Sequence, residues 1–409
     1  MSNDRRLPYL HSLAHLRTPN EPPWTDRKFG KSPDNDPRPA FERDRDRIIH
    51  SEHFRRLQHK TQVLIVTEGD LYSTRLMHSV ETAQVGRSLA CSLGLNAALA
   101  EAICLGHDVG HTPFGHQGED TLKRLLEGHG GWDSNHHSLL VLDEIEVQYP
   151  AHLGLDLTMA VREGIARHKT AYDDPAVGYG SGSELGAYRS PSLEAQISNV
   201  ADEVAYVSHD VHDALEHGLV TRDELDDALS GVSLWRRASR RTDGEVKALH
   251  PEGWKGVDES KLLVRQLHRN LISILLDDVL TESALRGAAH IGLPAARDSV
   301  RPVIDFSDEV RPQLDRVRDL LYQRVYKGPL VARQNAKADY VLERLFETLC
   351  AKRLLLPWHV QQRINGSEDP SVIAMNVALF VASLTDRAAI DLYAELYVPS
   401  DRAMGHHVH

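Results

Sequence analysis

The sequence is poor in cysteine and has no long hydrophobic run. Its three cysteines, Cys91, Cys104 and Cys350, lie far apart and form no C-x-x-C pair, which argues against a zinc knuckle or a disulfide framework. Reduced thiols are typical of the cytosol. No segment approaches the roughly 18 apolar residues that a membrane helix needs, and the first residues lack the apolar core of a signal peptide. These absences predict a soluble, cytoplasmic protein that does not cross a membrane.

Basic side chains are fewer than acidic ones. The chain of 409 residues has 59 acidic side chains against 47 lysines and arginines, which gives a formal net charge of -12. A protein with this balance is not a general binder of polyanions. A local basic groove is still compatible with it, so single-stranded nucleic acid stays open as a partner only through such a groove.

Strand-like alternation is absent, and apolar residues instead recur at helical spacing. The clearest case is the segment 193–218, where steps of three and four are followed by a glycine that is typical of a helix end. Its periodic residues are Leu193, Ile197, Val200, Val204, Val207, Val211 and Leu215. Ile48, Ile49, Phe54 and Leu57 are likewise expected to lie roughly on one helical stripe. Similar patterns over most of the chain predict an all-α protein with short connections.

Composition suggests three parts. Residues 1–40 are expected to form a largely irregular arm, because 18–40 are rich in Pro, Asp and Asn without a period. Residues 41–230 carry the strongest helical patterns and form the expected core. Residues 231–409 add further helices packed on that core. Residues 231–256 are expected to be irregular, and 172–192 to be a surface loop.

The segment 105–120, "LGHDVGHTPFGHQGED", concentrates imidazoles in a broken backbone. His107 and Asp108 end an apolar helix, and His78 and Asp202 lie on two other expected helices. Two imidazoles and two carboxylates suit Mn, Fe, Ni or Zn and accept Mg, with positions left for water and substrate. An isolated His-Asp pair more often caps a helix, and the chain has 24 histidines. The metal hypothesis therefore depends on the combination.

The order H…HD…D resembles the HD phosphohydrolase superfamily. The segments "FRRLQHKTQV", "TRLMHSVE", "GHDVGHTPFGHQGE" and "ADEVAYVSHD" are together similar to its deoxynucleoside triphosphate triphosphohydrolases, the bacterial dGTPases, over about residues 41–220. The resemblance implies an HD-domain helical bundle as catalytic core, one divalent metal per active site and a homo-oligomer. It also implies hydrolysis of a deoxynucleoside triphosphate, dGTP or another, to the deoxynucleoside and inorganic triphosphate.

Further side chains near the motif suit phosphate chemistry. His116 and Glu119 are three residues apart and share a helix face, so the carboxylate can orient the imidazole. Glu119 can equally complement the positive start of a helix. The resemblance implies that His116 is the catalytic acid or base and that His111 lies near the α-phosphate. Arg75, three residues before His78, is the best candidate for a phosphate clamp.

A row on the helix of Asp202 extends the expected site. Tyr206 and Asp210 follow it by four and eight residues and lie within about 80° around the helix axis. The resemblance implies that both contact the deoxyribose and that Gln62 reaches its 3′-hydroxyl. Taken alone, Tyr206 could equally be a core residue.

One segment departs from the family pattern. Ser134 stands where a histidine is usual in "GWDSNHHSL", and His137 stands where a glutamine is usual. His136 or His137 are conceivable substitutes for that histidine. Two alternatives stay open. The same site could serve an HD-type phosphatase or phosphodiesterase acting on other nucleotides, although Arg75 and the sugar-contact row argue against it. The departure at Ser134 keeps open a nucleotide-sensing or single-stranded DNA-binding protein with weak hydrolysis. Base preference and the physiological metal are not readable from the sequence.

Overall fold

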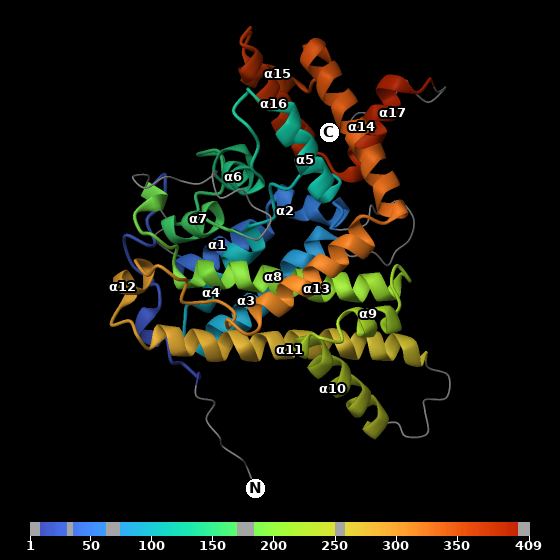
Figure 1. The fold of residues 1–409 in the computed structure, drawn as a ribbon. Helices are drawn as coiled ribbons and strands as arrows, with labels where there is room; N and C mark the ends of the chain where they lie inside the picture. The colour runs from blue at the N-terminus through green and yellow to red at the C-terminus, as the bar shows by residue number, and fades with distance from the viewer. Residues whose placement is uncertain (1–8, 31–35, 63–73, 170–183, 250–257, 400–409) are drawn as a thin grey trace.

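The computed structural model describes residues 9–30, 36–62, 74–169, 184–249 and 258–399 (Figure 1). In these residues helices account for the regular structure, and the only β pairing is three isolated bridges. The prediction of an all-α protein is confirmed.

The first part of the chain supplies the helices that surround the histidines. They are α1 (Ala40–Ile49), α2 (Glu52–Arg56), α3 (Arg75–Leu93), α4 (Ala97–Gly106), α5 (Gly115–Leu125), α6 (Ser134–Leu140), α7 (Met159–Ala166) and α8 (Leu193–Glu216). Short 3-10 turns occur at Ala14–Leu16, Leu57–His59 and Glu184–Gly186, and a π turn follows α6 at Val141–Ile145.

The second part is helical as well. It comprises α9 (Arg222–Ala228), α10 (Ser233–Leu249), α11 (Glu259–Gly287), α12 (Leu293–Arg297), α13 (Arg311–Leu321), α14 (Pro329–Ala351), α15 (Trp358–Ile364), α16 (Pro370–Ser383) and α17 (Asp386–Tyr397). A π turn, η5 (Tyr322–Tyr326), extends α13, and a 3-10 turn lies at Arg353–Leu355.

Helix ends coincide with side chains suited to them. The Thr74 hydroxyl accepts a hydrogen bond from the Met77 N–H at the start of α3, and Asn96 does the same for Leu99 at the start of α4. Gly94 ends α3 in the left-handed region at φ +79°, which glycine adopts without steric cost. Local sequence therefore fixes where the helices that carry the motif begin and end.

Two sequence expectations need correction. Residues 231–256 were expected to be irregular, but Ser233–Leu249 form α10. Leu234, Trp235 and Ala238 are buried along one side of it, and its many arginines and Gly244 disguise that narrow apolar stripe. The stripe expected to run from Ile48 through Leu57 is broken into α1, α2 and a 3-10 turn, because Ser51 caps a new helix. Most of the expected loop 172–192 lies outside the described residues.

Two hydrophobic clusters organise the molecule. The larger includes α1, α3, α4, α7 and α8 together with α10, α11 and α13. The smaller joins α5 to α14, α15, α16 and α17. Figure 1 shows α11 along one side of the α3, α4 and α8 layer, and α14 to α17 gathered around α5 on the other. The division of the chain at residues 40 and 230 stays a prediction.

The described part of the N-terminal arm is largely irregular and packs on the helices. Leu13 and Leu16 are fully buried, and the Thr18 N–H and hydroxyl both donate to Glu194 at the start of α8. Among the described helices, none is by itself long and apolar enough to span a membrane; α16 and α17 meet the criteria of length and composition only as a pair, with a bend of 118° between them.

Candidate metal centre and active site

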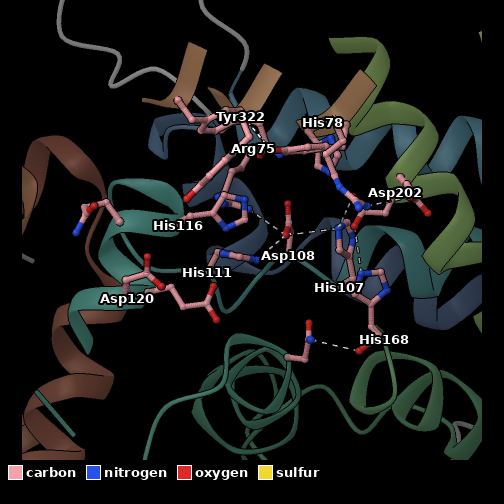
Figure 2. A pocket seen from close by; sticks show the side chains of 18 of the residues that line it. Arg75, His78, His107, Asp108, His111, His116, Asp120, His168, Asp202 and Tyr322 are labelled. Carbon is pink, nitrogen blue, oxygen red and sulfur yellow. Dashed lines mark hydrogen bonds and ion pairs between the residues drawn. The ribbon is translucent and has the colours of Figure 1, made fainter. Parts of the chain in front are cut away.

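Three helices bring predicted metal ligands together. His78 comes from the first turn of α3, His107 caps α4, and Asp202 lies in the middle of α8. One donor atom from each lies within 4.8 Å of the others, and all three side chains are buried (Figure 2). Close packing of α3, α4 and α8 against one another makes this possible although the residues are far apart in sequence.

The donor atoms of this group suit a divalent cation. The His107 Nδ1–H donates to the Cys104 carbonyl at 2.6 Å, which directs Nε2 toward the group. That Nε2 atom is buried and has no hydrogen-bond partner. His78 Nε2 lies 2.7 Å from Asp202 Oδ1. Two imidazole nitrogens facing a carboxylate are a donor set that transition metals and zinc accept.

Charge in the group also favours a cation. Burial would raise the pKa of Asp202, but the neighbouring imidazoles of His107, His168 and His78 outweigh it and lower that pKa well below its usual range. Burial would lower the pKa of His107, but Asp108 and Asp202 outweigh it and raise the pKa to about 9. Burial would likewise raise the pKa of Asp108, but His107, Arg75 and His111 outweigh it and lower that pKa. Both carboxylates are therefore ionised at neutral pH, and positive charge beside them stabilises this form.

Asp108 lies next to this three-residue group and not within it. Its Oδ1 is 3.4 Å from His107 Nε2, 3.1 Å from Arg75 Nη1 and 3.1 Å from His111 Nε2. Its Oδ2 is buried without a hydrogen-bond partner. The role of Asp108 as the fourth ligand stays a prediction.

His168 is a member of the site that sequence reasoning missed. It follows α7, and its Nε2 lies 3.3 Å from Asp202 Oδ2, while its ring centroid is 4.8 Å from that of His107. The carboxylate accepts the Nε2–H, so Nδ1 is left to accept from the Ser198 hydroxyl at 3.4 Å. Only the residue type signalled it, because no spacing relates His168 to the motif.

A tight turn links α4 to α5 and carries the remaining motif histidines. Phe114 has a left-handed backbone at φ +64°, and a Cβ added at Gly118 would lie 1.9 Å from the Pro113 carbonyl oxygen. A Cβ at Gly110 would lie 2.2 Å from the Ser138 backbone nitrogen. The glycines therefore let the turn fold back on itself and pack against α6.

His111 and His116 both line the cavity in an environment that keeps them neutral. Burial, followed by the charge of Arg75, lowers the pKa of His111 to about 3 and also lowers that of His116. Glu119 forms an ion pair with Lys123 at 3.1 Å and interacts electrostatically with His116. The structure brings the three predicted residues to one wall; the catalytic role of each stays a prediction.

Arg75 and Gln62 hold unused hydrogen-bonding atoms at the cavity. Arg75 is 2% exposed, and its Nε and Nη2 are buried without a hydrogen-bond partner among the described residues, while Nη1 contacts Asp108. Gln62 Oε1 is likewise buried without a partner. Two free guanidinium donors are what a phosphate oxygen requires.

The predicted sugar-contact row is only partly exposed to the cavity. Tyr206 lines it and donates to the Tyr326 hydroxyl at 2.6 Å, and Tyr326 donates to Asp210 Oδ2 at 2.8 Å. Asp210 itself is not among the lining residues, because Tyr326 stands between. Burial raises the pKa of Asp210 well above its usual range. Tyr326, from the C-terminal part, had no signal in the sequence.

Three residues of the segment that departs from the family pattern do not line the cavity: Ser134, His136 and His137. Ser134 starts α6 and is buried with its hydroxyl unpaired. The His137 Nδ1–H donates to the Gly110 carbonyl at 2.6 Å, and its ring packs on Trp132. Burial lowers the pKa of His137 to about 3. His136 is exposed. Neither histidine lines the cavity.

Together these side chains enclose a cavity of about 330 Å³. Figure 2 shows the metal-ligand candidates at one end and His111, His116 and Asp120 at the other, with Tyr322 above. Residues of the C-terminal part also line this cavity, namely two basic, two aromatic and one amide side chain: Arg318, Lys327, Tyr322, Tyr326 and Asn335. This arrangement combines a candidate metal centre, neutral imidazoles and basic side chains around one small volume.

Comparison with known proteins gives two domain matches and many relatives. Residues 75–207 match the family described as the HD domain, and residues 304–395 match the phosphohydrolase-associated domain. A deoxyguanosinetriphosphate triphosphohydrolase-like protein of Geobacter sulfurreducens is 41% identical over 369 residues, which cover 90% of this chain and 91% of the relative. A protein of the same description from Ralstonia nicotianae is 40% identical over 89% of this chain and 90% of the relative. A third, from Nitrosomonas europaea, is 39% identical over 88% and 91%.

Proposed function

The chain belongs to the HD-domain family of deoxyguanosinetriphosphate triphosphohydrolase-like proteins, and we propose that it is a metal-dependent hydrolase of deoxynucleoside triphosphates. The substrate is dGTP or another deoxynucleotide, and the products are the deoxynucleoside and inorganic triphosphate. The match to the HD domain, together with the names of the relatives, supports a hydrolase. The specific reaction is proposed from the relatives' names and from the contents of the cavity.

The observation that carries the proposal is the pair of unused Arg75 donors beside the histidine and aspartate group. A triphosphate carries close to four negative charges, and four basic side chains line the cavity: Arg75, Lys123, Arg318 and Lys327. Because Arg75 also contacts Asp108, a phosphate held by it lies next to the candidate metal ligands. This placement supports attack at the α-phosphorus.

A divalent ion held by His78, His107, Asp202 and Asp108 would lower the pKa of a water molecule and neutralise phosphate charge. The protein side chains supply the rest. His116 is neutral at physiological pH and can accept a proton. Bound triphosphate raises the pKa of this imidazole by its negative charge, so that His116 can then donate a proton to the leaving 5′-oxygen.

Sugar recognition is proposed for two further residues that line the cavity. We propose that Tyr206 packs against the deoxyribose and that Gln62 accepts from its 3′-hydroxyl, which would satisfy the unpaired Oε1. Asp210 acts there only through Tyr326, or directly after that tyrosine moves. Assembly into a homo-oligomer and a place in the cytoplasm stay predictions.

Product analysis tests the reaction. The protein is loaded with Mn²⁺, incubated with each of the four deoxynucleoside triphosphates, and the products are separated by ion-exchange chromatography. We expect tripolyphosphate and deoxynucleoside in equal amounts. Release of orthophosphate would support the phosphatase alternative. Binding without turnover, also in mixtures of nucleotides, would support a sensor instead.

A further inference from the structure

Asp386 begins α17, yet its carboxylate lies against the catalytic turn between α4 and α5. Oδ1 accepts from the Phe114 N–H at 2.9 Å. Oδ2 accepts from the Thr61 N–H at 3.0 Å and from the Thr61 hydroxyl. Asp386 is 5% exposed, and Thr61 and Phe114 are buried with it. One carboxylate from the C-terminal part thus ties two distant segments together.

Both tied segments lead directly into the cavity. Thr61 precedes Gln62, and Phe114 stands between His111 and His116 in the chain. The segments already touch, because a Cβ at Gly115 would lie 3.2 Å from the Gln62 carbonyl oxygen. The carboxylate therefore fixes the spacing between the proposed sugar contact and the proposed acid or base.

A second set of hydrogen bonds supports the same connection. The Lys60 ammonium donates to the carbonyls of His111 and Ala382, the latter at 2.8 Å. Arg56 donates to the Ser383 carbonyl at 3.1 Å. The Lys60 carbonyl in turn accepts from the Arg75 N–H at 3.1 Å. The end of α16 is thereby joined to the turn and to the start of α3.

We propose that Asp386 is a positioning residue for the hydrolysis, holding the turn of His116 in register with Gln62. The proposal rests on the function proposed above. It gives the phosphohydrolase-associated segment 304–395, which contains Asp386, a direct part in shaping the active site. Misplacement of catalytic groups by about 1 Å can cost about 100-fold in rate, so a buried tie of this kind matters for turnover.

An amide cannot replace this carboxylate. The three hydrogen bonds all need acceptors, and asparagine has one oxygen and a donor –NH₂ group. In Asp386→Asn either the Phe114 N–H or the Thr61 N–H faces that donor. The variant keeps the shape of the side chain but loosens one side of the tie.

The chain offers a matched control. Asp339 on α14 accepts from the Thr121 hydroxyl at 2.8 Å and from Arg124 at 2.9 Å, both on α5. It joins the same C-terminal helices to the same helix, but away from the turn. Asp339→Asn therefore weakens docking of these helices without touching Phe114 or Thr61.

Steady-state kinetics with Mn²⁺ and a deoxynucleoside triphosphate distinguish positioning from general support. We expect kcat of Asp386→Asn to fall roughly 10- to 100-fold with KM changed less than about threefold. Asp339→Asn stays within about twofold of the unmodified protein. Thr61→Ser keeps its activity, and Thr61→Val, which lacks only the hydroxyl bond, loses several-fold. Unchanged kcat in both Asp386→Asn and Thr61→Val, or an equal loss in Asp339→Asn, overturns the proposal.

Hydrogen exchange gives a reading that needs no catalysis. In Asp386→Asn, exchange accelerates in the peptide 107–116 and stays unchanged in α3 and α8; in Asp339→Asn it is unchanged in 107–116. If Asp386→Asn does not fold, the comparison of Thr61→Ser with Thr61→Val tests the proposal instead. If the unmodified protein releases no triphosphate, the proposed function fails, while exchange still reports on the tie. Unaltered exchange in 107–116 of folded Asp386→Asn refutes the tie itself.

Discussion

At the scale of single residues, buried polar atoms without partners indicate what the cavity binds. Leaving such an atom unpaired costs about 1–3 kcal/mol, and a bound ligand can offset that cost. Among the residues with such atoms, Arg75, His107, Asp108 and Gln62 line one cavity. The pattern fits a ligand with anionic oxygens and a cation at its side.

Arg75 gives the first prediction at this scale. Lysine keeps the charge but has no planar fork of donors, so Arg75→Lys cannot contact Asp108 and two phosphate oxygens together. We expect kcat/KM for a deoxynucleoside triphosphate to fall roughly 10- to 100-fold, since charge-assisted hydrogen bonds are worth about 1.5–3 kcal/mol. Arg87→Lys on the exposed side of α3 is the control and stays near the unmodified value. Equal effects in both variants would contradict the role of Arg75.

Lys60 gives a prediction about pH. Burial lowers its pKa in the folded protein from 10.5 to about 7, with Asp386 opposing and Arg56 and Arg75 adding to the shift. Between those values the unfolded chain binds the extra proton, so stability rises with pH; below about pH 7 the full cost of the buried charge is present. From pH 7 to 9 we expect the free energy of unfolding to gain about 2 kcal/mol relative to Lys60→Met.

Urea unfolding at a series of pH values measures that difference. Lys337→Met, at an exposed position on α14, serves as the control and should follow the unmodified protein at every pH. Parallel curves for the unmodified protein and Lys60→Met would show that Lys60 keeps its ordinary pKa in the folded state.

At the scale of helices, the close packing of the backbone between α4 and α5 restricts which residues can stand there. Gly118 lies in the first turns of α5, where a Cβ would lie 1.9 Å from the Pro113 carbonyl oxygen. Gly244 lies inside α10 with nothing within 4 Å of an added Cβ. Substitution by alanine should therefore lower the stability of the protein at Gly118 and raise it at Gly244.

We predict that Gly118→Ala lowers the melting temperature and abolishes turnover, because the turn must shift to admit a methyl group. Gly244→Ala should stabilise the protein by roughly 0.5–1 kcal/mol, the usual gain in a helix interior. Differential scanning calorimetry and the activity assay compare the two variants. A Gly118→Ala protein with unchanged stability would show that the turn is not closely packed.

Helices were predictable where apolar spacing and caps agree, as in α4 and α8. They were not predictable where arginines surround a narrow stripe, as in α10, or where one serine interrupts a continuing pattern, as at Ser51. Site residues followed the same logic. His78, His107 and Asp202 could be chosen together, and the structure brings their donor atoms together. His168 and Tyr326 could not, because only tertiary packing relates them to the motif.

At the scale of the whole molecule, the cavity lies where the two hydrophobic clusters meet. Residues on α3 and α8 and at the end of α4, which belong to the larger cluster, line one part of it. Another part is lined by α5, which carries His116 and packs with α14 in the smaller cluster. Residues from η5 and α14 line it as well. The family resemblance read from residues 41–220 is confirmed over about nine-tenths of the chain. The residues that the C-terminal helices contribute to the cavity could not be predicted from the sequence, because those helices carry no local signature of the site.

Metal binding at the candidate centre should therefore raise the stability of the entire fold. An ion held by α3, α4 and α8 binds the folded chain alone and stabilises it by about 2.7 kcal/mol at a 100-fold excess over Kd. We expect Mn²⁺ to raise the melting temperature of chelator-treated protein, and Asp202→Asn to reduce that rise strongly. Asp213→Asn, on the same helix but outside the donor group, should keep it. A rise of equal size in Asp202→Asn would place the bound ion elsewhere and leave the three-helix centre without support.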